Sequence, residues 1–327
     1  IDSPFTRLIE SNHVGSRNRR YRLSWEPGQH SLRTCHLVTI VLLSRVRSSK
    51  RTDRLQPESA ISAIGGHQMW ITSDVNLPQA ILDAQSDGRL VFFVGASASV
   101  DEPSGLPLFG ELARNLAEMA RVPFNKNIAL DFFLGSMPES FETHRHTRNI
   151  VAREDSAPNT THAALVRVAS SVGQLRVVTT NFDSHLSSAA AAGGIEVSDL
   201  WVGPALPLGE DFTGIVHLHG SVLRDPRELV LTDGDFGRAY LTNAWATRFL
   251  LPMFQSSTVL FIGYSHEDPI MRYLALGLPS GTPRYAFVNA EEVDDVKWTR
   301  LGVETIGYPV KGHNHTALVA ALEAWDL

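Results

Sequence analysis

An uninterrupted apolar run, residues 90–94, constrains the fold more than any other stretch of the chain. A run of this length without a polar residue is typical of a strand buried on both faces, as in parallel sheets. It ends in the small residues 95–99, where the backbone must turn tightly, and a helical pattern follows over residues 108–120. This order suits a loop that binds a phosphate through backbone N–H groups, but a tight turn without a ligand fits it equally well.

The alternation of strands and helices continues along the chain and predicts an α/β fold with a doubly wound parallel sheet, Rossmann-like in type. A mixed stretch, residues 125–155, predicts a helical insertion, and we interpret its polar patch, 142–148, as a solvated helix face rather than a phosphate contact. Further strands are expected at 176–180, 215–221, 259–265, 284–288 and 303–309, and further helices at 73–84, 162–171, 184–192, 243–254, 268–276 and 315–325.

Composition excludes several classes of protein. The single cysteine, Cys35, rules out a disulfide within the chain and a zinc site of four cysteines, so we expect a cytoplasmic protein without a bound metal. No apolar run approaches the roughly 20 residues that span a bilayer, and we expect no membrane partner. The net charge of -6 gives no reason to expect nucleic-acid binding by the core.

Residues 1–68 differ in charge from the rest of the chain. The first 66 residues hold eleven Lys and Arg against five acidic residues, and Met69 is the first methionine. We therefore divide the chain into a basic extension, 1–68, and a folded domain, 69–327. The extension is expected to be disordered or to lie upstream of the true start. A basic arm for nucleic acid or a partner, or a transit peptide, remains an alternative.

Four predicted strands end in small or polar residues, at 95–99, 181–183, 219–221 and 263–265. Ligands of open parallel sheets bind beyond the carboxyl ends of the strands, so these four ends are expected to form one site. Each has a simpler explanation when taken alone. Asn181 or Asp183 can cap a helix, His219 can be a core histidine with its hydrogen bonds satisfied, and Gly263 can serve a turn.

These motifs, in this order, resemble the sirtuin fold, and they are most similar to the bacterial sirtuin-like NAD hydrolases of antiphage defence. The resemblance covers roughly residues 73–325. It also rests on Gly105-Leu106-Pro107, on residues 229–240 and on Asp268-Pro269. It implies that NAD is the substrate and that the bond between nicotinamide and ribose is broken.

The resemblance also implies roles for individual residues. Asn181 would hold the nicotinamide ribose and the attacking water, and His219 would be the general base or the partner of a ribose hydroxyl. A histidine suits this role because it titrates near neutrality, and a neutral amide can place water without competing for charge. Asp183 would support the site, and Asp268 would cap a helix. The residues expected to bind the cofactor are Gly95, Ala96, Ser97, Ser99, Thr180, Asp183, Gly263, Tyr264 and Ser265.

Two departures from the family pattern keep other functions open. Ser97 stands where the family usually has glycine, and the four-cysteine zinc module of the deacetylase sirtuins is absent from the sequence. We expect an NAD hydrolase that a partner activates, either as a homo-oligomer or with a separate sensing protein. The alternatives are a sensor or assembly module that binds NAD or ADP-ribose without turnover, and an NAD-dependent protein deacylase.

Overall fold

The computed structural model describes residues 68–264, 282–293, 295–310 and 315–326. Nearly all of the predicted extension, the helix expected at 268–276, Ser265 and Asp268 lie outside these described residues. Two short antiparallel strands, β1 (Gln68–Trp70) and β2 (Asn76–Pro78), come first. They lead into helix α1 (Gln79–Ser86).

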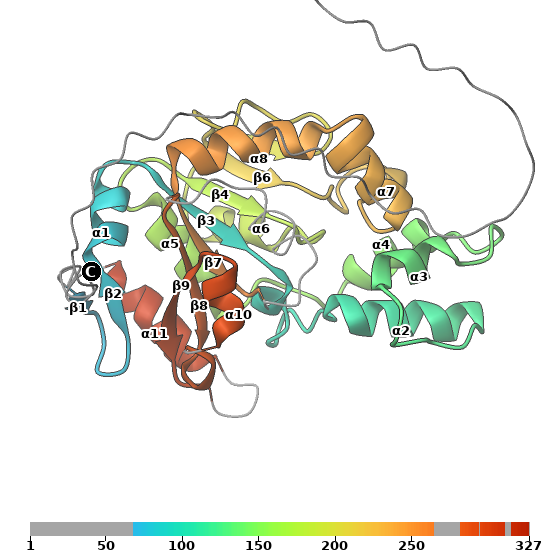
Figure 1. Cartoon of the computed structure of the whole chain (residues 1–327), viewed down its shortest axis with the longest axis horizontal. Helices are drawn as coiled ribbons and strands as arrows, with labels where there is room; N and C mark the ends of the chain where they lie inside the picture. Colours follow the sequence, from blue (N-terminus) through green and yellow to red (C-terminus); the bar gives the residue numbers. More distant parts are fainter. Residues whose placement is uncertain (1–67, 265–281, 294, 311–314, 327) are drawn as a thin grey trace, which may run out of the picture. The chain divides into compact units, whose positions relative to one another are not determined.

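A parallel sheet of seven strands forms the centre of the fold, in the order β5-β6-β4-β3-β7-β8-β9 (Figure 1). Every neighbouring pair in it is parallel. The strands are β3 (Leu90–Val94), β4 (Arg176–Thr179), β5 (Leu200–Val202), β6 (Gly214–His217), β7 (Thr258–Ile262), β8 (Arg284–Asn289) and β9 (Glu304–Tyr308). The doubly wound parallel sheet predicted from the sequence is confirmed.

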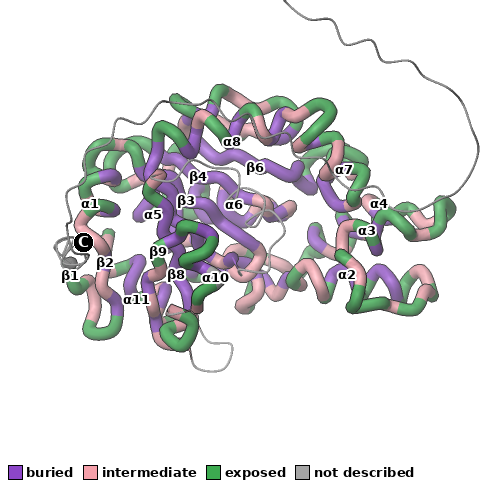
Figure 2. The backbone as a smooth tube through the Cα atoms, viewed as in Figure 1, coloured by how far each residue is buried: buried purple, intermediate pink, exposed green. Residues whose placement is uncertain are grey.

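Helices cover both faces of this sheet, because alternate strand residues point to opposite sides. Phe92 and Val94 pack with α1, α5 (Thr160–Ser170), α6 (His185–Ala192) and α11 (Thr316–Trp325). Val91 and Phe93 pack with α8 (Trp245–Ser256) and with Trp298 of α10 (Val296–Arg300). Figure 2 shows the buried strands between helices whose outer sides are exposed. None of the helices among the described residues has the length and apolar character needed to cross a membrane.

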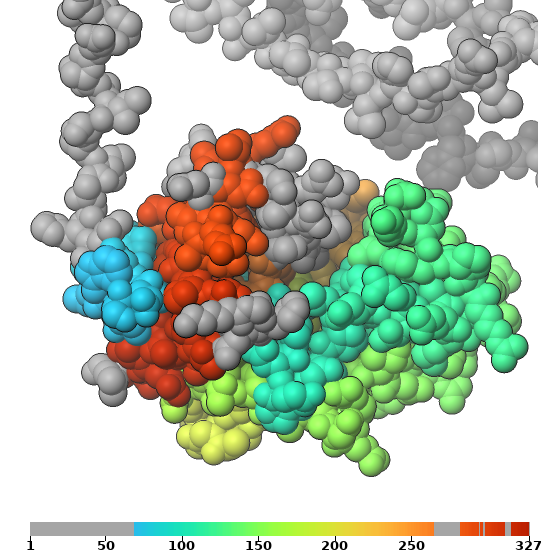
Figure 3. Space-filling model, turned by 90° about the horizontal axis from the view of Figure 1, so that it is seen from below, coloured from blue at the N-terminus to red at the C-terminus, as the bar shows by residue number. Residues whose placement is uncertain are grey.

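The predicted helical insertion is present between β3 and β4. It contains α2 (Phe109–Ala120), α3 (Leu130–Gly135) and α4 (Thr143–Val151). Its small core, which includes Leu116 and Phe133, also takes in Leu231 from the segment that follows β6. In Figure 3 the residues of this insertion, coloured teal to green, lie to one side of the red residues near the end of the chain.

The segment after β6 is built from three short helices. These are η2 (Pro226–Glu228), α7 (Asp233–Gly237) and the π-helix η3 (Arg238–Thr242). The sequence patterns did not predict this series, nor did they predict β1, β2, β5 and α10. The helix expected from residue 73 begins only at Gln79, because residues 76–78 pair with β1 instead.

Candidate functional site

The four strand ends selected from the sequence belong to four neighbouring strands, in the order β6-β4-β3-β7. Thr179 is in register with both Val94 and His217, and Val94 is in register with Ile262. Because the strands are parallel, the residues that follow them meet at one edge of the sheet. From β3 the chain adds β4 on one side of β3 and later adds β7 on its other side. The strand order therefore reverses between β3 and β7, and ligands of such sheets bind at this topological switch point.

At the switch point the backbones after β3 and β7 approach closely. Gly95 N–H donates to the Ile262 carbonyl, and Ser97 N–H donates to the Gly263 carbonyl. A Cβ at residue 95 would lie 2.6 Å from the Gly263 oxygen and 2.8 Å from the Tyr264 ring. Gly263 itself has a φ of +76°, where a side chain is strained. Both glycines are therefore required by the contact between the two loops.

The loop after β3 uses several of its own N–H groups within the protein. Ala98 N–H donates to the Gly95 carbonyl, which closes the short 3-10 helix η1 (Ala96–Ser99). With the bonds of Gly95 and Ser97, three N–H groups of the predicted phosphate loop are already occupied. Contact of this loop with phosphates stays a prediction, and it would have to use other groups of the loop.

Asn181, the predicted catalytic amide, is buried and held by two hydrogen bonds from its side chain. Its Nδ2 donates to the Gly95 carbonyl at 3.1 Å and to Ser99 Oγ at 3.2 Å. The Gly95 carbonyl can only accept, which fixes the orientation of the amide. Within the described part of the chain no donor reaches Asn181 Oδ1. This oxygen is therefore available to accept a hydrogen bond from a ligand or a water.

Ser99 lies at the centre of a buried hydrogen-bond network. Asn159 N–H donates to His162 Nδ1, so His162 carries its proton on Nε2 and donates it to Ser99 Oγ at 3.1 Å. The Ser99 hydroxyl in turn donates to Asp183 Oδ2 at 2.9 Å. Burial lowers the pKa of His162 to about 4, although the Asp183 carboxyl opposes the shift. Ser99 thus connects the predicted site residues Asn181 and Asp183 to a histidine that remains neutral.

His185 and Ser156, which the sequence analysis missed, complete this network. Asp183 Oδ1 accepts from the backbone N–H of His185, at the start of α6. The His185 ring bonds Ser156 Oγ at 2.8 Å and packs edge-on to His162, with 5.3 Å between centroids. The signal that could have revealed His162 is its position three residues after Asn159, a capping box with histidine in the place of the usual Glu or Gln.

His219, the predicted base, follows β6 and is 4% exposed. Its Nε2 is 2.8 Å from the hydroxyl of Tyr240, and Phe236 packs edge-on against the ring. Burial lowers the pKa of His219 to about 3, so the imidazole is neutral at pH 7. Among the residues that the structure describes, none forms a hydrogen bond to its Nδ1.

His217, two residues before His219, forms a hydrogen bond with the backbone of Asn181. Its Nδ1 lies 3.2 Å from the Asn181 carbonyl, which only accepts, so Nδ1 carries the proton. Its buried Nε2 has no hydrogen-bond partner among the described residues, and burial lowers its pKa. The backbone and the side chain of Asn181 are therefore fixed by separate contacts.

Tyr264, which follows β7, contacts the ends of β3 and β4. Its hydroxyl lies 2.6 Å from Thr180 Oγ1 and donates to the Val94 carbonyl at 3.2 Å. These contacts place two of the predicted cofactor-binding residues beside β3. With Ala96 and Ser97 in the adjoining loop, every predicted site residue except Ser265 falls at this edge, and Ser265 lies outside the described residues.

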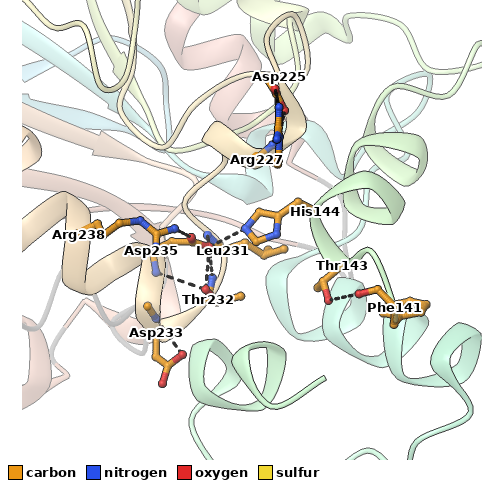
Figure 4. Close-up of polar contacts among 11 residues, drawn as sticks. Phe141, Thr143, His144, Asp225, Arg227, Leu231, Thr232, Asp233, Asp235 and Arg238 are labelled. Carbon is orange, nitrogen blue, oxygen red and sulfur yellow. Dashed lines mark hydrogen bonds and ion pairs between the residues drawn. The ribbon is translucent and has the colours of Figure 1, made fainter. Parts of the chain in front are cut away.

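A separate groove of about 840 Å³ lies between the helical insertion and the segment that follows β6. Asp235 connects two residues of its lining: Oδ2 accepts from His144 at 2.7 Å and from the Thr232 N–H and hydroxyl, while Arg238 pairs with Oδ1 (Figure 4). Burial raises the pKa of Asp235, but these hydrogen bonds outweigh it and hold the pKa below its ordinary value. His144 belongs to the patch 142–148, so this part of the patch binds the protein itself rather than solvent alone.

Two comparisons relate the chain to known proteins. Residues 175–306 match the family model described as a SIR2-like domain, which supports the sirtuin-like resemblance and an activity that involves NAD. The matched region contains Asn181, Asp183, His219, Tyr240 and Gly263. The chain is also 28% identical, over 280 residues, to the uncharacterized protein y4cA of Sinorhizobium fredii. That match covers 73% of this chain, and the chain spans only 22% of that relative's length.

Proposed function

We propose that the protein is an NAD hydrolase that releases nicotinamide and ADP-ribose. One observation carries the proposal: an amide oxygen on Asn181 and a ring nitrogen on His219 follow neighbouring strands and have no partner among the described residues. A hydrolase of this bond needs such a pair, one group to place water and one to form a hydrogen bond with the sugar.

The residues at the sheet edge fit NAD as a substrate. The contact of Gly95 with Gly263 removes side chains from the switch point, where dinucleotides bind in related sheets. Breaking the nicotinamide–ribose bond develops positive character on the sugar, as in glycoside hydrolysis. The nicotinamide leaves as a neutral ring and needs no strong acid. Orientation of water and sugar therefore supplies much of the catalysis, and Asn181, held by two hydrogen bonds, is rigid enough to provide it.

Purified protein incubated with NAD tests the proposal. Nicotinamide should be released by the wild type and reduced at least about 100-fold in Asn181→Ala and His219→Ala. Asn149→Ala, at an exposed position of α4, is the matched control and should retain activity. Absence of nicotinamide release by the wild type, alone and with its candidate partners, would count against hydrolysis.

We propose further that the hydrolase acts in antiphage defence and is activated by self-assembly or by a sensing partner. In the relative y4cA the similar region belongs to a much longer protein, which supports an effector domain that works with other parts. Size-exclusion chromatography combined with the NAD assay tests this. A strict monomer that is fully active alone would contradict activation by assembly.

One observation favours a second function, a sensor that binds NAD or ADP-ribose without turnover. His219 is deeply buried and its pKa is lowered to about 3, which makes it a weak base before a ligand binds. Calorimetry separates the two functions. Lasting NAD binding without product favours the sensor, whereas heat from a continuing reaction favours the hydrolase.

A further inference from the structure

Tyr240 is hydrogen-bonded to His219 and is the more exposed of the two residues. The phenol oxygen lies 2.8 Å from His219 Nε2. Tyr240 is partly exposed, whereas His219 is 4% exposed. The partly exposed phenol, rather than the buried imidazole, is therefore the outer member of this hydrogen-bonded pair.

The direction of this hydrogen bond follows from the acidity of its two members. A phenol, with a pKa near 10, is a far stronger donor than the N–H of a neutral imidazole. Tyr240 therefore donates to Nε2, and the ring proton of the neutral His219 is on Nδ1. In this state Nδ1 can donate to a ligand, while the only lone pair of the imidazole faces Tyr240.

The segment that carries Tyr240 is fixed at several points. Tyr240 lies in the π-helix η3, a rare element that is frequent at functional sites. Phe236, one turn earlier, stacks on the Tyr240 ring and packs edge-on against His219. Asp235 anchors α7 to α4 through His144, and Val230 N–H donates to the His219 carbonyl. These contacts hold the phenol and the imidazole in one arrangement.

We propose that Tyr240 is a catalytic residue that contacts a sugar hydroxyl of the substrate and passes its proton to His219. The inference rests on the proposed function. The hydroxyl O–H bond breaks as its proton binds the Tyr240 oxygen, and the Tyr240 proton moves to His219 Nε2. The phenol is neutral before and after the step, the imidazole becomes an imidazolium, and the sugar oxygen gains the negative charge that stabilises the positive character of the ring.

The chain provides a matched control for this pair. Tyr308 forms a second tyrosine–histidine hydrogen bond, 2.9 Å from its hydroxyl to His315 Nδ1, between β9 and the residue that precedes α11. The variants are Tyr240→Phe, His219→Ala, the double variant of these two, and Tyr308→Phe. Replacement by Phe retains the ring that stacks on Phe236, and circular dichroism together with NAD calorimetry checks folding and binding.

Nicotinamide release measured over a range of NAD concentrations tests the relay. We expect Tyr240→Phe to lower kcat at least about 100-fold, with KM changed less than about threefold. The kcat of the double variant should lie within about threefold of the kcat of the slower single variant, because both residues serve one step. Tyr308→Phe should stay within about twofold of the wild type.

Failure of the relay and failure of the proposed function give different results. A wild type that releases no nicotinamide removes both. With an active wild type, two results overturn the relay and leave the NAD hydrolase in place. One is a kcat of Tyr240→Phe above half of the wild-type value, and the other is a double variant in which the effects of the single variants multiply.

Discussion

Removal of the Ser99 hydroxyl tests whether the buried network holds the site together. In Ser99→Ala, Asp183 loses a donor, Asn181 loses one of its two acceptors, and the Nε2–H of His162 is left without a partner. A hydrogen bond to a charged group contributes about 1.5–3 kcal/mol, and a buried unsatisfied donor costs about 1–3 kcal/mol. Because these effects overlap, we expect the free energy of unfolding to fall by about 3 kcal/mol.

Urea denaturation followed by circular dichroism measures this change. With a slope of about 3 kcal/mol per molar urea, the midpoint should fall by about 1 M. Ser97→Ala is the matched control, because Ser97 lies in the same loop and forms no side-chain hydrogen bond with any described residue. The control should stay within about 0.5 kcal/mol of the wild type.

The same variant should weaken catalysis, because the Asn181 side chain keeps only the Gly95 carbonyl as a hydrogen-bond partner among the described residues. Loss of one orienting hydrogen bond, at about 1 kcal/mol, corresponds to roughly a fivefold fall in the rate of nicotinamide release. Two results would refute the reasoning. One is a loss of stability below about 1 kcal/mol in Ser99→Ala, and the other is an equal loss in Ser97→Ala.

Three further predictions follow from buried and close-packed groups. Below pH 6.5 the unfolded chain protonates His162 while the folded protein keeps it neutral to about pH 4, so His162 should lower the stability by about 3 kcal/mol across this window. His219, whose pKa is lowered to about 3, adds a loss of the same sign and similar size, and urea midpoints against pH measure the sum. An unchanged midpoint between pH 6.5 and pH 4 would contradict this. Gly263→Ala places a Cβ 2.9 Å from backbone atoms at a φ of +76° and should cost at least about 2 kcal/mol, whereas Gly237→Ala, with no atom within 4 Å, should cost nothing in thermal unfolding. Asp235→Asn weakens the bonds to His144 and Arg238 and should lower the stability by about 3 kcal/mol and slow nicotinamide release, whereas Asp225→Asn, an exposed pair with Arg227, should change the melting temperature by less than about 1 °C.

The buried strands were the part of the fold most open to prediction. Runs such as residues 90–94 are apolar on both faces, and this pattern is set by burial alone. The short strand β5 was not predicted, because Leu200 is 40% exposed and three residues give too little pattern. Helix α1 was expected too early, since the pairing of Met69 with Leu77 is a contact between segments that no local pattern reveals.

The site was predictable in part for the same reason. Small or polar residues after apolar strands are visible in the sequence, and they pointed to Asn181, His219 and Gly263. His162 and Tyr240 were not singled out, because each lies on a helix where it looks like an ordinary helical residue. Their importance comes from the tertiary contacts with Ser99 and His219, which bring together residues 63 and 21 positions apart.

The chemistry of the site depends on the register of the sheet. Backbone groups, which cannot change their role, fix three polar side chains: the Gly95 carbonyl fixes Asn181, the Asn181 carbonyl fixes His217, and the Asn159 N–H fixes His162. A slip of β4 by one residue against β3 would place Thr180 where Asn181 stands and would turn the buried side chains to the other face. The register that packs Val177 in one core with Phe92 and Val178 in the other with Phe93 therefore also presents Asn181 Oδ1, so the core of the sheet and the orientation of the amide are specified together.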